Sequence, residues 1–216
     1  MNTRILLFIA ALCVLLLAAC AAPRKADMSE LRNSKPVSIL VLPPVNLSPD
    51  IRGSLTVLST VTLPLAEAGY YVFPVALVEA TFKENGLALP DQMHEAPLSK
   101  LQSIFGADAV LYLTLEKYGS SYVVIDSQTV VSVKARLVDA RTGTLLWQGQ
   151  ASASDAEGRD NNNGLLGVLL TSVIHQLASN IGNPGHQVAK VASTRLLSPH
   201  DGGLLYGPRS PNYGKD

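Results

Sequence analysis

Cysteine is nearly absent from this sequence. Only Cys13 and Cys20 occur among its 216 residues. Cys13 lies in an N-terminal apolar run that we expect to be cleaved, so Cys20 would be the sole cysteine of the mature protein. A disulfide bond is thereby excluded from the mature chain. A chain of this length can nevertheless bury enough apolar surface to fold as one domain without such a bond.

The sequence also has no excess of charge of either sign. Its 17 Lys and Arg residues balance 17 Asp and Glu residues, and the charges are scattered rather than gathered in blocks. This pattern argues against a nucleic-acid-binding surface, which needs a concentration of basic residues. It also argues that attachment to a membrane would depend on a lipid rather than on a basic patch.

Motifs for catalysis and metal binding are lacking as well. We find no nucleophile elbow, phosphate-binding loop or dinucleotide fingerprint, and no pair of histidines one helical turn apart. Four carboxylates could stand on strands but are explained more simply as turn and strand-end residues. We therefore expect no catalytic residue, no cofactor and no metal site. The histidines are His94, His175, His186 and His200, and the carboxylates are Asp108, Glu116, Asp126 and Asp139.

The N-terminus has the layout of a cleaved export signal. Arg4 precedes an apolar run from Ile5 to Ala19. The segment Leu17-Ala18-Ala19-Cys20 matches the lipobox at each position, and its cysteine supplies the nucleophilic sulfur that accepts a diacylglyceryl group. We therefore expect residues 1–19 to be a lipoprotein signal peptide and Cys20 to be lipidated. The alternative is a signal anchor long enough to span a bilayer, which Arg24 and Lys25 disfavour.

Two or three acyl chains on Cys20 would hold the protein on a membrane essentially permanently. Ala21, rather than Asp, follows the cysteine, and this resembles the usual pattern for sorting to the outer membrane. We expect an outer-membrane anchor with the domain facing the periplasm. Residues 20–36 are polar and mixed in charge, which indicates a tether; an extra helix over Met28–Asn33 is nearly as compatible with the sequence.

Strands and helices alternate in the first half of the domain, which we place at residues 37–182. Val37–Leu42 is predicted to be a strand that Pro43-Pro44 ends. A helix is expected over Ile51–Ala68, with Leu55, Leu58 and Leu65 on its buried face and a kink or split at Pro64. A short strand at 70–74, a helix at 75–85 and a helix at 97–105, ended by Gly106, are expected to follow.

After Gly106 the pattern becomes a meander of antiparallel strands. We expect strands at 109–117, 122–126, 130–139 and 144–152, with turns at 119–120 and 141–143. An apolar helix at 165–181 should pack across the sheet, and residues 183–216 should form an irregular tail that wraps the domain or is free. The fold class predicted is α/β (α+β): a single mixed sheet with an antiparallel meander, packed by helices.

Three aromatic residues are candidates for protein contacts. Asp139 and Gly143 fit a turn in which the Asp carboxylate accepts backbone hydrogen bonds and the glycine adopts a positive φ. Trp147 follows this turn and would either fill the edge of the core or act as an exposed binding anchor. Tyr206 and Tyr213 in the tail are the other candidate contact residues.

Several of these segments together resemble a known family. The lipobox, the run Val37–Asn46, the helix-to-strand entry Phe105–Leu111 and the hairpin Leu137–Trp147 are similar to a family of bacterial lipoproteins of unknown function. More distantly, they resemble the periplasmic α/β domain of TolB amino-terminal regions and of CsgG-like curli secretion lipoproteins. The resemblance implies a TolB amino-terminal-like fold and an outer-membrane lipoprotein, often encoded beside a CsgG-like one, without established enzymatic activity.

We therefore expect a non-enzymatic accessory lipoprotein that binds another envelope protein, such as a CsgG-like lipoprotein, or a second copy of itself. An edge strand or the Tyr-rich tail would form the contact. Two alternatives stay open at this point. One is a periplasmic hydrolase acting on cell-wall or lipid material, suggested by location and by scattered carboxylates and serines. The other is a carrier of an apolar ligand, suggested by the segment 165–181.

Overall fold

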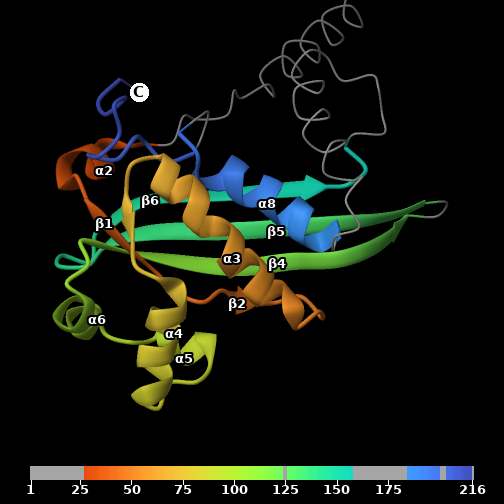
Figure 1. The fold of residues 1–216 in the computed structure, drawn as a ribbon, viewed down its shortest axis with the longest axis horizontal. Coiled ribbons are helices and arrows are strands. Elements are labelled where there is room, and N and C mark those ends of the chain that lie inside the picture. Colours follow the sequence, from red (N-terminus) through yellow and green to blue (C-terminus); the bar gives the residue numbers. More distant parts are fainter. Residues whose placement is uncertain (1–26, 124–125, 158–183, 200–202, 216) are drawn as a thin grey trace, which may run out of the picture.

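A computed structural model describes residues 27–123, 126–157, 184–199 and 203–215 (Figure 1). A single mixed sheet forms its centre, with strand order β3-β1-β4-β5-β6, and β2 pairs with β4 beside β1. Pairing is parallel among β3, β1, β2 and β4, and antiparallel from β4 to β6. The strands are β1 (Ser38–Val41), β2 (Val45–Asn46), β3 (Tyr71–Val72), β4 (Ala109–Val123), β5 (Asp126–Asp139) and β6 (Leu145–Ser154). The predicted mixed sheet with an antiparallel meander, packed by helices, is confirmed.

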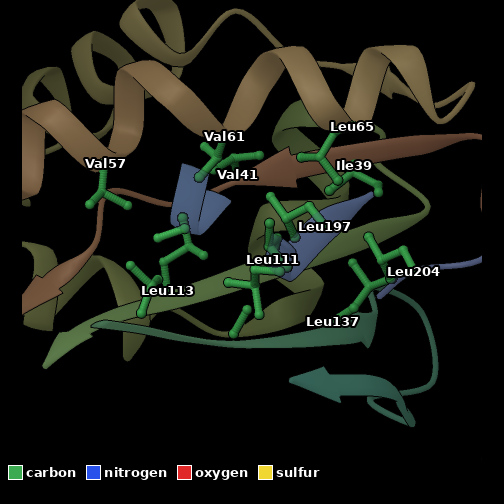
Figure 2. Packing of buried hydrophobic residues seen from close by; sticks show 14 of the residues in the cluster. Ile39, Val41, Val57, Val61, Leu65, Leu111, Leu113, Leu137, Leu197 and Leu204 are labelled. Carbon is green, nitrogen blue, oxygen red and sulfur yellow. The ribbon is translucent and has the colours of Figure 1, made fainter. Parts of the chain in front are cut away.

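Helices α3 (Arg52–Glu67) and α8 (Pro184–Leu197) cover one face of the sheet (Figure 1). The core beneath them draws alternate residues from the central strands, as Figure 2 shows for Ile39, Val41 and Leu111. Between the two helices, the hydroxyls of Thr60 and Ser193 lie 2.8 Å apart and are both buried. A small residue such as Ser193 allows the helices to approach closely, while the hydrogen bond satisfies the buried polar groups.

Three helices cover part of the opposite face. They are α4 (Val75–Glu84), α5 (Pro90–His94) and α6 (Leu98–Phe105). Side chains that alternate with those of the first core, including Leu40, Leu42 and Val110, pack against Val78 and Phe82 here. Since successive residues of a strand point to opposite faces, one sheet supplies both cores.

The hairpin between β4 and β5 is longer than predicted. A turn was expected at Gly119-Ser120, but β4 continues to Val123, which pairs with Asp126. Gly119 has a φ of 115° and still pairs with Val130. The residue types that indicated a turn are therefore accommodated within a paired strand, and the prediction of two separate strands was wrong.

Regular structure also extends beyond both predicted ends of the domain. Helix α2 (Ser29–Ser34) lies within the segment expected to be a tether, and its Leu31 is only 2% exposed, in the core. The helix considered as an alternative for this segment is thus present. Helix α8 lies within the tail expected to be irregular; its buried residues are mostly small, so its helical periodicity was weak in the sequence. The helix predicted at 165–181 lies outside the described residues.

Helix α3 buries Leu58 and Leu65, as expected, but not Leu55. Val57, Val61 and Leu65 are completely buried, whereas Leu55 is 63% exposed. The helix is not split at Pro64, which is itself buried. The prediction of a split at Pro64 was therefore wrong.

Candidate interaction surface

Cys20, the predicted lipidation site, lies outside the described residues, so its modification stays a prediction. Asp27, where the described chain begins, is the seventh residue after it. In the part of the chain that the structure describes, no helix combines the length and apolar character needed to cross a membrane.

The C-terminal segment, residues 203–215, is docked against the domain. The Gly207 backbone N–H donates to the Ala68 carbonyl at 2.8 Å, and the Tyr70 hydroxyl donates to the Leu205 carbonyl at 2.8 Å. Leu204 is 1% exposed and belongs to the first core. Of the two alternatives considered for these residues, wrapping the domain is therefore the correct one.

Two glycines make this docking possible. A Cβ atom at Gly69 would lie 2.4 Å from the backbone nitrogen of Ser210, and one at Gly207 would lie 2.7 Å from the carbonyl oxygen of Gly69. Gly69 also has a φ of 96°, which L-residues rarely adopt. Only a chain without side chains at these two positions can bring the backbones this close.

The C-terminal segment and α2 enclose a hollow of about 330 Å³, the terminal hollow (Figure 1 shows the two segments side by side). Both predicted tail contacts, Tyr206 and Tyr213, line it, so the structure brings these two residues together. The sequence analysis missed the residues of α2 and its end, because they lie at the other end of the chain. The hollow is lined by Leu31, Arg32, Lys35, Pro36, Tyr70, Leu205, Tyr206, Pro208, Tyr213 and Gly214.

Trp147, the third predicted contact, is not a surface residue. It is 2% exposed and lies in the first core. Gly149 leaves room for the indole ring, because a Cβ there would lie 2.4 Å from Trp147 Cζ2. The alternative in which Trp147 fills the core is correct, and Trp147 cannot serve as an exposed anchor in this conformation.

An apolar surface that the sequence analysis did not identify lies at the start of α3. Leu47, Ile51 and Leu55 are 66%, 86% and 63% exposed. They are spaced four residues apart along the loop after β2 and the first turns of α3, and we call them the apolar patch. The four-residue spacing of these three side chains is visible in the sequence, but Leu55 was predicted to lie on the buried face of the helix.

The uncovered part of the second sheet face is polar. Lys134 pairs with Glu116 at 2.5 Å, and the Gln150 side-chain amide donates to the same carboxylate at 2.8 Å. The Arg136 guanidinium lies 4.8 Å from the centre of the Tyr112 ring. These side chains satisfy one another, which is the usual state of a solvated sheet face.

Two of the carboxylates considered for chemistry hold the backbone in place. Asp108 accepts hydrogen bonds from the backbone N–H groups of Val37 and Ser38, both at 3.0 Å. Asp139 accepts one from the Ser34 hydroxyl at 2.7 Å and others from the N–H groups of Arg141 and Thr142. Burial acts to raise the pKa of Asp139, but these hydrogen bonds outweigh it and leave the pKa below its usual value.

The turn predicted around Asp139 is confirmed, since Gly143 adopts a φ of 74° and its N–H donates to the Asp139 carbonyl at 2.9 Å. No group of three or more His, Cys, Asp and Glu residues suited to a metal ion occurs among the described residues. The side chains of Asp126 and His175 lie outside them.

His94 lies on α5, and its pKa is lowered from the ordinary value. Burial lowers its pKa, and the nearby Arg136 adds to this effect, while the hydrogen bond to the Pro43 carbonyl and the charge of Asp91 oppose it. Its Nε2 donates to that carbonyl at 2.9 Å, and its ring meets Tyr112 edge-on. These contacts tie α5 to the end of β1, which is a structural role.

Comparison with known proteins gives consistent matches. The GNA1162-like lipoprotein family matches residues 26–209. Lipoprotein NMB1124/NMB1162 of Neisseria meningitidis serogroup B is 51% identical over 200 residues, covering 91% of this chain and 92% of its own. The crystal structure of lipoprotein GNA1162 from Neisseria meningitidis shares 51% identity and a TM-score of 0.55, covering 67% of this chain and 100% of that one.

At much lower similarity, the C-terminal domain of LpoB from Salmonella enterica matches with 20% identity and a TM-score of 0.39, over 55% of this chain and 83% of that chain. The family assignment depends on the closer matches, which extend over most of the chain. The family expected from the sequence, bacterial lipoproteins of unknown function, is confirmed: this chain belongs to the GNA1162-like family of lipoproteins.

Proposed function

We propose that this protein is an outer-membrane lipoprotein, anchored through Cys20, whose domain acts in the periplasm as a non-enzymatic, protein-binding component of an envelope assembly. Its partner is another envelope protein, such as a CsgG-like lipoprotein, or a second copy of the chain. Membership of a lipoprotein family supports the anchor, and Ala21 after the cysteine supports the outer membrane as its site.

The observation that carries the binding role is the apolar patch. Isolated apolar residues are normal on a surface, but neighbouring large ones that are mostly exposed mark sites of interaction. Ile51 and Leu55 lie one helical turn apart and share a face of the chain entering α3, with Leu47 just before them. Beyond Arg52, α3 has no charged residue before Glu67. Its outward side therefore offers little that would resist desolvation by a partner.

Site-specific cross-linking in the native envelope tests this role. A photoreactive amino acid would replace Leu55 in the full lipoprotein, and the captured product would be identified by mass spectrometry. Leu77 on α4 is the matched control, because it is 62% exposed but lies on the opposite layer. We expect position 55, and not position 77, to capture one defined envelope protein or a second copy.

The same experiment in a Cys20→Ser variant tests the anchor separately. Loss of both membrane association and capture supports anchoring through Cys20. Equal yields from positions 55 and 77 would contradict the binding role, and unchanged membrane association of the variant would contradict the anchor.

A further inference from the structure

The terminal hollow has the composition of a site for an anion. Arg32 and Lys35 line it, together with three tyrosines, and none of its lining residues is acidic. Its volume of about 330 Å³ is within the range of pockets that hold small ligands. The Tyr70 hydroxyl is engaged with the Leu205 carbonyl, so the positive charge considered for a ligand is that of Lys35.

Lys35 occupies an unusual position at the end of α2. It has a φ of 48° and a ψ of 52°, and it is the only non-glycine residue with positive φ in the described part of the chain. Glycine or asparagine would adopt this conformation at lower cost. A lysine is present instead, its side chain makes no ion pair with any described residue, and it lies at the hollow. Strained residues that a fold retains are often functional.

The position of the hollow along the chain limits what can reach it. Asp27 is the seventh residue after Cys20, and seven extended residues span at most about 25 Å. Helix α2, which forms one wall, begins two residues later. A lipid on Cys20 therefore keeps the hollow close to the bilayer surface, where phosphate groups are the most abundant anions and where tyrosine side chains are favoured.

We propose that the terminal hollow binds the phosphate of a membrane phospholipid headgroup. Lys35 would pair with the phosphate, and Tyr206 and Tyr213 would contact the glycerol region. This inference depends on the proposed anchoring at Cys20, which supplies the proximity. The role is orientation rather than attachment: the acyl chains hold the protein, and the hollow fixes which side of the domain faces the bilayer.

The test uses the full lipidated protein in vesicles that carry a photoactivatable phosphatidylglycerol, with mass spectrometry of the cross-linked peptides. We expect cross-links in residues 29–36 and 204–215. In Lys35→Gln, the phosphatidylglycerol content needed for half-maximal cross-linking should rise roughly fivefold, the effect of one cation at an anionic surface. Lys190→Gln is the control, because Lys190 is exposed on α8 and does not line the hollow.

The outcomes separate the two proposals. Protein that does not co-sediment with vesicles contradicts the anchor. Protein that co-sediments but cross-links equally well in wild type, Lys35→Gln and Lys35→Glu contradicts the hollow. Soluble glycerol phosphate is added in a third arm. Abolition of the cross-links at low millimolar concentration would identify a free phosphate ester as the ligand and overturn the membrane source. Persistence of the cross-links supports the headgroup.

Discussion

The hydrogen bond from His94 to the Pro43 carbonyl connects α5 to the end of β1. Because His94 titrates, its contribution to stability can be measured as a dependence on pH. In the unfolded chain its pKa lies near 6.5, and burial lowers it in the fold. The unfolded state therefore binds more protons as the pH falls below about 6.5, so the free energy of unfolding is highest above this pH and decreases below it.

We expect His94→Gln to weaken this dependence. Glutamine can still donate to the Pro43 carbonyl but does not titrate. The comparison is the urea midpoint from pH 7.5 to 5.5, where one titrating group changes stability by at most about 1.4 kcal/mol per pH unit. Identical pH profiles for the two proteins would show that His94 does not contribute.

The close approach at Gly69 predicts a second residue-scale effect. Gly69→Ala combines an unfavourable φ with a clash against Ser210 and should destabilise the fold by about 2 kcal/mol or more. Gly86→Ala is the control: Gly86 has a φ of 81° but nothing within 4 Å of a Cβ, so only the conformational cost of about 1 kcal/mol applies. Thermal unfolding measures both, and equal losses would argue against the packing of the C-terminal segment.

At the scale of elements, the docked C-terminal segment behaves as part of the core. Truncation of a buried leucine costs about 2–5 kcal/mol, so we expect a loss in this range for Leu204→Ala. Tyr213→Ala, at a residue that is 42% exposed, should change stability by less than about 0.5 kcal/mol. Chemical denaturation of both variants is the measurement. A neutral Leu204→Ala would mean that the segment does not dock in solution.

The elements also show which patterns were sufficient for prediction. The β-branched run before Pro43-Pro44 and the glycine after α6 are local signals, and both predictions were confirmed. Gly119 was misleading because pairing with β5 outweighs its turn propensity. Helix α8 was missed because its buried face consists largely of small residues, such as Ala189 and Ala192. The terminal hollow could not be predicted, since its walls come from opposite ends of the chain.

At the scale of the whole molecule, the apolar patch and the terminal hollow lie at different places and can be tested independently. We expect Leu55→Ser to leave stability within about 0.5 kcal/mol of wild type, because the side chain is largely exposed, and to reduce co-purification of the proposed envelope partner. Leu77→Ser should change neither the stability nor the co-purification. Co-purification is measured by quantitative mass spectrometry. If Leu55→Ser leaves it unaltered, the contact lies elsewhere on the domain.

The position of β1 determines how the domain would respond to mechanical tension between the proposed anchor and the proposed partner. The chain passes from α2 directly into β1, which lies between β3 and β4, and the Asp108 carboxylate holds its first residues. Pulling along the tether loads the hydrogen bonds on both sides of this strand together. A lipoprotein that must resist movement between a membrane and an assembly gains from such shear loading, because several bonds must break at once.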